Sequence, residues 1–123
     1  MTASVLVVDD NPINRDLVCT VLGYRGYSTR TAGGGAEALE VMGADRPDLV
    51  LTDVVMPQMD GYALVRAIRA DSSLRDTRVV FYTANVLTEP DRAEAIDLDV
   101  AKIVEKVGDV GALLDAVADA LVA

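Results

Sequence analysis

The stretch Leu49-Val50-Leu51-Thr52-Asp53 is a short apolar run that ends on a carboxylate. A run of this length and composition is typical of a strand that is buried on both faces of a sheet. An aspartate is costly inside such a strand, but it fits at the carboxyl end, where open α/β sheets bind their ligands. The stretch therefore predicts a central parallel strand with a functional Asp53 at its end.

Short apolar runs and stretches of helical periodicity alternate along the rest of the chain. Further strands are expected at residues 5–8, 27–31, 79–82 and 101–105. The first helix opens at Asn11-Pro12, a pair favoured at helix starts, and the helix predicted over residues 86–98 has the weakest apolar pattern. Five strands alternating with helices predict an α/β fold with a parallel sheet covered on both faces. We expect one domain over residues 1–123, with no linker or internal repeat.

The first helix should bury one apolar stripe, made of Ile13, Leu17, Val18, Val21 and Leu22. Cys19 falls off this stripe and is expected to be an inert thiol. As the only cysteine it cannot form an internal disulfide, so a reducing compartment is the simplest assumption.

Charge and composition exclude several kinds of function. The chain has 20 acidic and 11 basic residues, a formal net charge of -9, and no histidine. Histidine catalysis and histidine metal ligation are therefore excluded, and direct binding to nucleic acid or to an anionic membrane is disfavoured. The chain begins almost directly with a strand and has no apolar run near the length of a membrane span. We expect a cytoplasmic protein without an export signal.

The ends of the predicted strands carry the candidate site. Right-handed crossovers bring the carboxyl ends of parallel strands to one edge of the sheet, which should gather Asp9, Asp10, Asp53, Thr83 and Lys106. Three carboxylates repel one another unless a cation neutralises them, and an all-oxygen ligand set suits Mg²⁺. Lysine and hydroxyl groups suit phosphoryl oxygens, and a carboxylate can accept a phosphoryl group as a mixed anhydride. Asp53 is the best placed acceptor.

Each residue alone also has a structural interpretation. Asp9 or Asp10 could cap the first helix, and Asp60 beside Gly61 is expected to be a turn and helix-start residue rather than a ligand. A strand-end threonine is usually structural, and Lys106 alone could be a solvated charge. The convergence of all five at strand ends favours a site.

On these residues the chain resembles the receiver domain of two-component response regulators. The matching pieces, in order along the whole chain, are Val7-Val8-Asp9-Asp10-Asn11, Asp48-Leu49-Val50-Leu51-Thr52-Asp53, Met56-Pro57-Gln58-Met59-Asp60-Gly61, Thr83-Ala84 and Lys106. The chain is similar both to stand-alone receivers and to receivers of hybrid sensor kinases. The resemblance implies a flavodoxin-like (βα)5 doubly wound sheet with strand order 2-1-3-4-5.

The resemblance also implies a role for each site residue. Asp53 would be the phosphoacceptor, Thr83 the switch hydroxyl and Lys106 the phosphate contact. Asp10 would ligate Mg²⁺ directly, Asp9 largely through water, and the main-chain carbonyl of Val55 would complete the protein ligands. The donor would be a histidine on a sensor kinase or phosphotransfer protein, and a downstream effector would read the output from the region Val86 to Val117. The domain would be a switch that assists its own phosphorylation and dephosphorylation, not an enzyme.

Three positions depart from the family pattern. Val107 replaces the usual proline after the lysine, so the loop that carries Lys106 is expected to take a different path, since a cis peptide is costly without proline. Ile103 replaces the usual aromatic of the fifth strand, which alters the coupling to Thr83. Val55 offers no polar side chain to position attacking water, so we predict a long-lived phosphoryl-aspartate.

Two other functions remain as alternatives. A receiver that docks partners regardless of phosphorylation is favoured by the departures at Val107 and Ile103. A Mg²⁺-dependent phosphatase or a small nucleotide-binding enzyme is weaker, because no D-x-D acceptor pair ends a strand. In addition, Gly33-Gly34-Gly35 lacks the spacing of a phosphate-binding loop.

Overall fold

A parallel five-stranded sheet forms the centre of the molecule. The computed structural model describes residues 2–106 and 110–122. The elements follow one another as β1 (Ser4–Val8), α1 (Pro12–Tyr24), β2 (Ser28–Ala32), α2 (Gly35–Ala44), β3 (Leu49–Thr52), α3 (Gly61–Ala70), β4 (Arg78–Thr83), α4 (Glu89–Asp97), β5 (Lys102–Glu105) and α5 (Val110–Val122). The strand order is β2-β1-β3-β4-β5 with all pairs parallel, which confirms the predicted topology.

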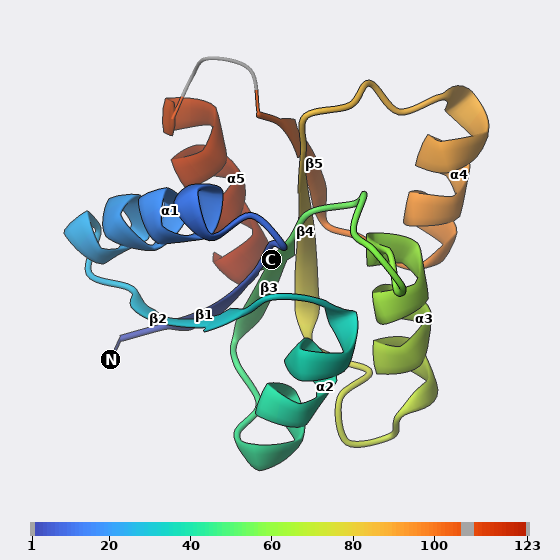
Figure 1. Ribbon diagram of the computed structural model, residues 1–123, viewed down its shortest axis with the longest axis horizontal. Coiled ribbons are helices and arrows are strands. Elements are labelled where there is room, and N and C mark those ends of the chain that lie inside the picture. Colours follow the sequence, from blue (N-terminus) through green and yellow to red (C-terminus); the bar gives the residue numbers. More distant parts are fainter. Residues whose placement is uncertain (1, 107–109, 123) are drawn as a thin grey trace.

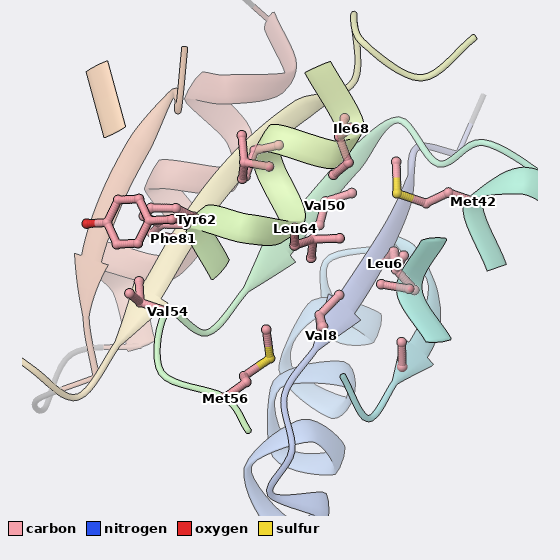
Figure 2. Packing of buried hydrophobic residues seen from close by; sticks show 14 of the residues in the cluster. Leu6, Val8, Met42, Val50, Val54, Met56, Tyr62, Leu64, Ile68 and Phe81 are labelled. Atoms are coloured by element: carbon pink, nitrogen blue, oxygen red, sulfur yellow. The ribbon is translucent and has the colours of Figure 1, made fainter. Parts of the chain in front are cut away.

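The helices cover the two faces of the sheet unequally. In Figure 1, α1 and α5 lie on one face and α2, α3 and α4 on the other. Side chains alternate along each strand, so Val5 and Val7 of β1 pack with the α1 and α5 side, while Leu6 and Val8 pack with the opposite side. Every residue of β3 is buried, as its apolar sequence predicts. Figure 2 shows Leu6, Val8, Val50, Leu64 and Ile68 within the larger of the two clusters.

The strand register aligns the carboxyl ends that carry the site. Val8 of β1 is level with Thr52 of β3, and Thr52 is level with Phe81 of β4. The backbone N–H of Asp53 donates to the carbonyl of Val8 at 2.9 Å. The residues that follow β1 and β3 therefore leave the sheet side by side.

The start of α1 agrees with the sequence, but its buried face does not. The side chain of Asn11 accepts from the backbone N–H groups of Ile13 and Asn14, and Pro12 is the first helical residue. The predicted stripe was wrong for Ile13 and Leu17, which are 78% and 59% exposed. The face of α1 that is turned to the sheet runs through Asn14, Val18 and Leu22, four residues apart, so Ile13 and Leu17 lie on the outer side of the helix.

Cys19 also differs from its predicted placement. Its side chain is half-buried and packs against the cluster between α1, α5 and the sheet. Burial raises the pKa of the Cys19 thiol, although a hydrogen bond with Thr29 opposes this shift. A raised pKa leaves little thiolate at neutral pH, which supports the expected inert character.

The contacts between helices α3 and α4 are mostly polar. Helix α4 buries only Ala95 of its own residues and is closed at its start by a capping box between Thr88 and Asp91. The Tyr62 hydroxyl of α3 donates to the carbonyl of Asp91 at 3.0 Å, and Arg66 pairs with Glu94 at 2.7 Å. Within residues 2–106 and 110–122, no helix is long and apolar enough to cross a membrane.

We expect Tyr62→Phe to loosen α4. Loss of the Tyr62–Asp91 hydrogen bond should lower the free energy of unfolding at neutral pH by about 1 kcal/mol. Burial and then the charges of Asp91, Glu94 and Asp60 raise the pKa of Tyr62 above its ordinary value of 10.0. The unfolded chain therefore loses this proton first as pH rises, so the contribution is present below pH 10.0 and declines above it.

The measurement is urea unfolding at neutral pH and above pH 10.0. The difference between wild type and Tyr62→Phe should be largest at neutral pH and shrink at alkaline pH. Tyr24→Phe is the matched control, because Tyr24 is exposed and its substitution should have little effect at either pH. A difference between wild type and Tyr62→Phe that grows with pH would contradict the assignment.

Candidate functional site

The candidate site residues lie at the carboxyl ends of four neighbouring strands, at one edge of the sheet. Asp9 follows β1, Asp53 follows β3, Thr83 ends β4 and Lys106 follows β5. The backbone N–H of Lys106 donates to the carbonyl of Thr83 at 2.7 Å, which ties the ends of β4 and β5 together. The structure thus places these residues at one edge, as predicted, and Asp10 follows Asp9 there.

Three carboxylates form a compact acidic cluster. One oxygen from each of Asp9, Asp10 and Asp53 lies within 4.8 Å of the others. Asp9 is buried, Asp53 is half-buried and Asp10 is exposed. An all-oxygen donor set of this size suits a hard divalent cation such as Mg²⁺, which keeps several waters and takes few protein carboxylates. The chemistry of the donors therefore fits the predicted magnesium site.

Lys106 neutralises part of this cluster. Its Nζ donates to Oδ2 of Asp9 and to Oδ2 of Asp53, both at 2.9 Å. Burial alone would lower the pKa of Lys106, but the hydrogen bonds and charges of Asp9 and Asp53 outweigh it and raise the pKa. With three carboxylates and one ammonium, the cluster has a formal charge of -2. That charge is matched by one divalent cation.

The remaining carboxylate oxygens are not equivalent. Oδ1 of Asp9 accepts from the backbone N–H of Asn11 at 2.9 Å, and Oδ1 of Asp53 accepts from that of Val54 at 2.7 Å. In the described part of the chain, no residue donates a hydrogen bond to the Asp10 side chain. The arrangement favours Asp10 as a direct metal ligand. The separate roles of Asp9, Asp10 and the Val55 carbonyl stay predictions.

The helix-cap alternatives are resolved by the structure. Asn11, not Asp9 or Asp10, caps α1. Asp60 caps α3, because its Oδ1 accepts from the backbone N–H of Ala63 at 2.8 Å, which confirms its predicted role at a helix start. Asp9 and Asp10 are therefore not needed as caps.

The two positions that are predicted to act in switching, Thr83 and Ile103, lie on the neighbouring strands β4 and β5. Thr83 is fully buried, and its Oγ1 accepts from the backbone N–H of Asn85 at 3.1 Å. Ile103 is half-buried and packs against the cluster between the sheet, α3 and α4. The expectation about the path after Lys106 falls on Val107, which lies outside the described residues.

Sequence reasoning missed two residues around the site. A guanidinium nitrogen of Arg15 donates to the main-chain carbonyl of Asp9 at 3.0 Å. The Lys106 Nζ lies 5.6 Å from the centroid of the Tyr82 ring, within reach of a cation–π interaction. The position of Arg15 one turn after Asn11 is a usable signal for the first contact. Tyr82 has no such signal in the sequence, because its ring comes near Lys106 only once β4 and β5 have paired.

Comparison with known families identifies this arrangement. The sequence model of the response regulator receiver domain matches residues 5–118. The chain belongs to this family. As a receiver domain, it is part of two-component signalling, and the predicted resemblance is confirmed.

The curated relatives include a sensor histidine kinase and a response regulator. The chain is 48% identical over 85 residues to the sensor histidine kinase RcsC of Salmonella typhimurium, covering 69% of this chain and 9% of RcsC. It is 40% identical over 70 residues to the response regulator MprA of Mycobacterium bovis, covering 57% of this chain and 30% of MprA. The chain thus spans only a small part of these relatives.

Solved structures show the same fold over nearly the whole chain. The chemotaxis protein CheY4 of Vibrio cholerae has a TM-score of 0.91 at 30% identity, covering 98% of this chain and 100% of CheY4. The receiver domain of a signal transduction histidine kinase from Syntrophus aciditrophicus has a TM-score of 0.87 at 29% identity, covering 98% and 91%. The flavodoxin-like fold is therefore confirmed.

Proposed function

We propose that this domain is a phosphorylation-driven switch in which Asp53 accepts a phosphoryl group from a histidine in a Mg²⁺-dependent reaction. The observation that carries the proposal is the cluster of Asp9, Asp10 and Asp53 with Lys106 bridging two of its members. Such a cluster suits a divalent cation and a phosphoryl group together. The relatives named as sensor histidine kinase and response regulator support a kinase partner.

The transfer needs little covalent chemistry from the protein. An Asp53 carboxylate oxygen forms a bond to phosphorus, the phosphorus–nitrogen bond of the donor histidine breaks, and its electron pair returns to the imidazole nitrogen. The product is a mixed anhydride on Asp53. Mg²⁺ held by Asp9, Asp10 and Asp53 would neutralise the carboxylates and the phosphoryl oxygens. Lys106 would exchange its hydrogen bond with Asp53 for one with the phosphoryl group.

The surface formed by α4, β5 and α5 would transmit the effect of phosphorylation to a downstream effector. The Thr83 hydroxyl lies at the end of β4 and can turn toward a phosphoryl group on Asp53. Helix α4 follows within a few residues and buries only Ala95, so a small change at Thr83 can bias its position. A downstream effector would read this change.

The test is intact mass after incubation with acetyl phosphate and Mg²⁺. Wild type should gain one phosphoryl adduct that requires Mg²⁺ and maps to Asp53, and Asp53→Ala should gain none. A folded wild-type protein that gains no adduct from acetyl phosphate, nor from any phosphohistidine donor, would instead support the receiver that docks partners regardless of phosphorylation.

The exposed apolar face at the start of α1 is the proposed docking site for the donor protein. Leu17 lines a small cavity of about 120 Å³ together with Tyr82 and Lys106, which places it beside the site. Ile13, one turn earlier, is also exposed. An apolar face next to the acceptor suits a partner helix that delivers a phosphohistidine.

We expect Leu17→Glu to slow phosphotransfer from a kinase or phosphotransfer protein by about tenfold or more, because it places a charge in a desolvated contact. Phosphorylation by acetyl phosphate should be unchanged. Tyr24→Glu is the matched control at the exposed far end of α1 and should leave both rates unchanged. Equal losses with protein donor and acetyl phosphate would mean that Leu17 acts on the site itself and not on docking.

We expect the phosphoryl group on Asp53 to be long-lived. The Val55 side chain is exposed two residues after Asp53 and has no polar atom to position an attacking water. After removal of the donor, the adduct should decay slowly by intact mass, and Val55→Gln should shorten its lifetime. Loss of the wild-type adduct within seconds would contradict this expectation.

A further inference from the structure

A second cavity lies at the opposite edge of the sheet from Asp53. Its volume is about 520 Å³, and residues of the connections before β3, β4 and β5 line it. Six charged residues line it, four arginines and two aspartates: Arg46, Arg69, Arg75, Arg78, Asp76 and Asp99. Four positive and two negative charges leave a formal +2 in a chain whose net charge is -9. The cavity is therefore a cationic site on an acidic protein.

Arg69 holds together the chain segments that form the wall of this cavity. Its guanidinium donates to four main-chain carbonyls, those of Leu98 at 2.9 Å, Arg75 at 2.7 Å, Thr77 at 2.6 Å and Asp99 at 3.2 Å. These bonds join α3 to the connections before β4 and β5. All four acceptors are neutral carbonyls, so the positive charge of Arg69 is not cancelled by these contacts. The site is held in shape before any ligand arrives.

Two other arginines are available to a ligand. Arg46 precedes β3 and Arg75 precedes β4, and both are exposed. Within the described residues, neither guanidinium donates a hydrogen bond or forms an ion pair. A free guanidinium can bind one phosphoryl group with two parallel hydrogen bonds. Two of them on separate connections suit a ligand with two phosphoryl groups.

Thr77 gives a second, independent indication of a missing partner. It lines the same cavity and is only 2% exposed. Within the described part of the chain, its Oγ1 is the buried side-chain polar atom that has no hydrogen-bond partner. Buried hydroxyls are rarely left unpaired in native proteins. An anion seated against this wall would supply the acceptor.

We propose that this cavity binds a small anion that carries a diphosphate group, either inorganic pyrophosphate or a nucleoside diphosphate. A water molecule occupies about 30 Å³ in the liquid, so the volume admits a ligand much larger than one phosphate. The site is separate from the acidic cluster and does not depend on phosphorylation of Asp53. Because Arg69 also holds the Leu98 and Asp99 carbonyls after α4, the bound anion would contact the wall that positions this helix.

The test is isothermal titration calorimetry of the whole chain with pyrophosphate, ADP and phosphate in EDTA, so that no Mg²⁺ is present. Pyrophosphate should bind with one site per chain, and Arg46→Gln combined with Arg75→Gln should weaken it by about tenfold or more. Arg25→Gln, which removes an exposed arginine at the end of α1, should bind as wild type does. Tighter binding of ADP would identify a nucleotide, and equal binding would mean that only the diphosphate group is recognised.

Thr77→Val separates a ligand contact from a structural role. It removes the unpaired hydroxyl at nearly constant volume, so the unliganded protein should melt at the same or a higher temperature, while pyrophosphate binding weakens. The proposal is overturned if pyrophosphate does not bind saturably to the wild type, if the double arginine variant binds it as tightly as wild type, or if phosphate binds as tightly as pyrophosphate.

Discussion

Replacing Lys106 with methionine is expected to destabilise the metal-free protein by about 3 kcal/mol, and Mg²⁺ should restore most of that loss. The Lys106 side chain is 13% exposed, and its partners Asp9 and Asp53 are 5% and 13% exposed. Without the ammonium, the three carboxylates would face one another with no cation bonded to them among the described residues, because the Arg15 guanidinium donates to the main-chain carbonyl of Asp9 and not to a carboxylate. A divalent cation would take over its neutralising role, so the variant should depend on Mg²⁺ for stability.

The same variant should bind Mg²⁺ about tenfold more tightly than wild type, because a positive charge no longer repels the ion at short range. Urea unfolding in EDTA and in Mg²⁺ measures the first effect, and calorimetric titration with Mg²⁺ measures the second. Lys102→Met is the matched control, since Lys102 is exposed at the start of β5, the strand that Lys106 follows, and its substitution should change stability by at most about 0.5 kcal/mol. If Lys106→Met is as stable as wild type in EDTA and binds Mg²⁺ no more tightly, Lys106 does not substitute for the cation.

The fold was predictable because its signals are local and repeated. The apolar run before Asp53 gave a fully buried β3, and Asn11-Pro12 gave the start of α1. The predicted strand ends then brought Asp9, Asp53 and Lys106 together, since crossover handedness leaves little choice about which edge they reach. The observed strands agree with the predicted ones to within about a residue at each end.

Other features depend on tertiary placement and have no local signal. Apolar side chains lie on more than one side of α1, and only the packing of the helix against the sheet selects the side of Val18 and Leu22 and leaves Leu17 exposed. The contact of Lys106 with both Asp9 and Asp53 requires the paired ends of β4 and β5. The carbonyls bound by Arg69 come from two loops that meet only in the folded chain.

Gly61 is the position where such a tertiary constraint should be most costly to break. The sequence predicted only a turn and helix start at Asp60-Gly61. In the structure, a Cβ at Gly61 would lie 2.7 Å from the main-chain oxygen of Asp53 and 3.0 Å from the Cα of Val54. Both are backbone atoms of the loop that follows β3, so this loop must move to admit even one methyl group.

We therefore expect Gly61→Ala to lower the free energy of unfolding by about 2–3 kcal/mol. It should also slow phosphorylation of Asp53 by acetyl phosphate by about tenfold or more, because a small displacement of the acceptor loop misaligns the reacting group. The backbone N–H of Gly61 donates to the Val54 carbonyl at 2.8 Å, so the shift is transmitted directly to the residues beside Asp53. Urea unfolding and the rate of adduct formation by intact mass measure the two effects.

Gly23→Ala provides the control of opposite sign. Gly23 is the last but one residue of α1, and a Cβ there meets nothing within 4 Å. The same substitution should therefore stabilise the protein by about 0.5–1 kcal/mol, because alanine loses less backbone freedom on folding. It should leave the phosphorylation rate unchanged. Gly61→Ala and Gly23→Ala could instead shift the free energy of unfolding in the same direction and be phosphorylated at the same rate. That result would mean that the loop after β3 moves at little cost, and that the contact of Gly61 with the Asp53 carbonyl does not position the acceptor.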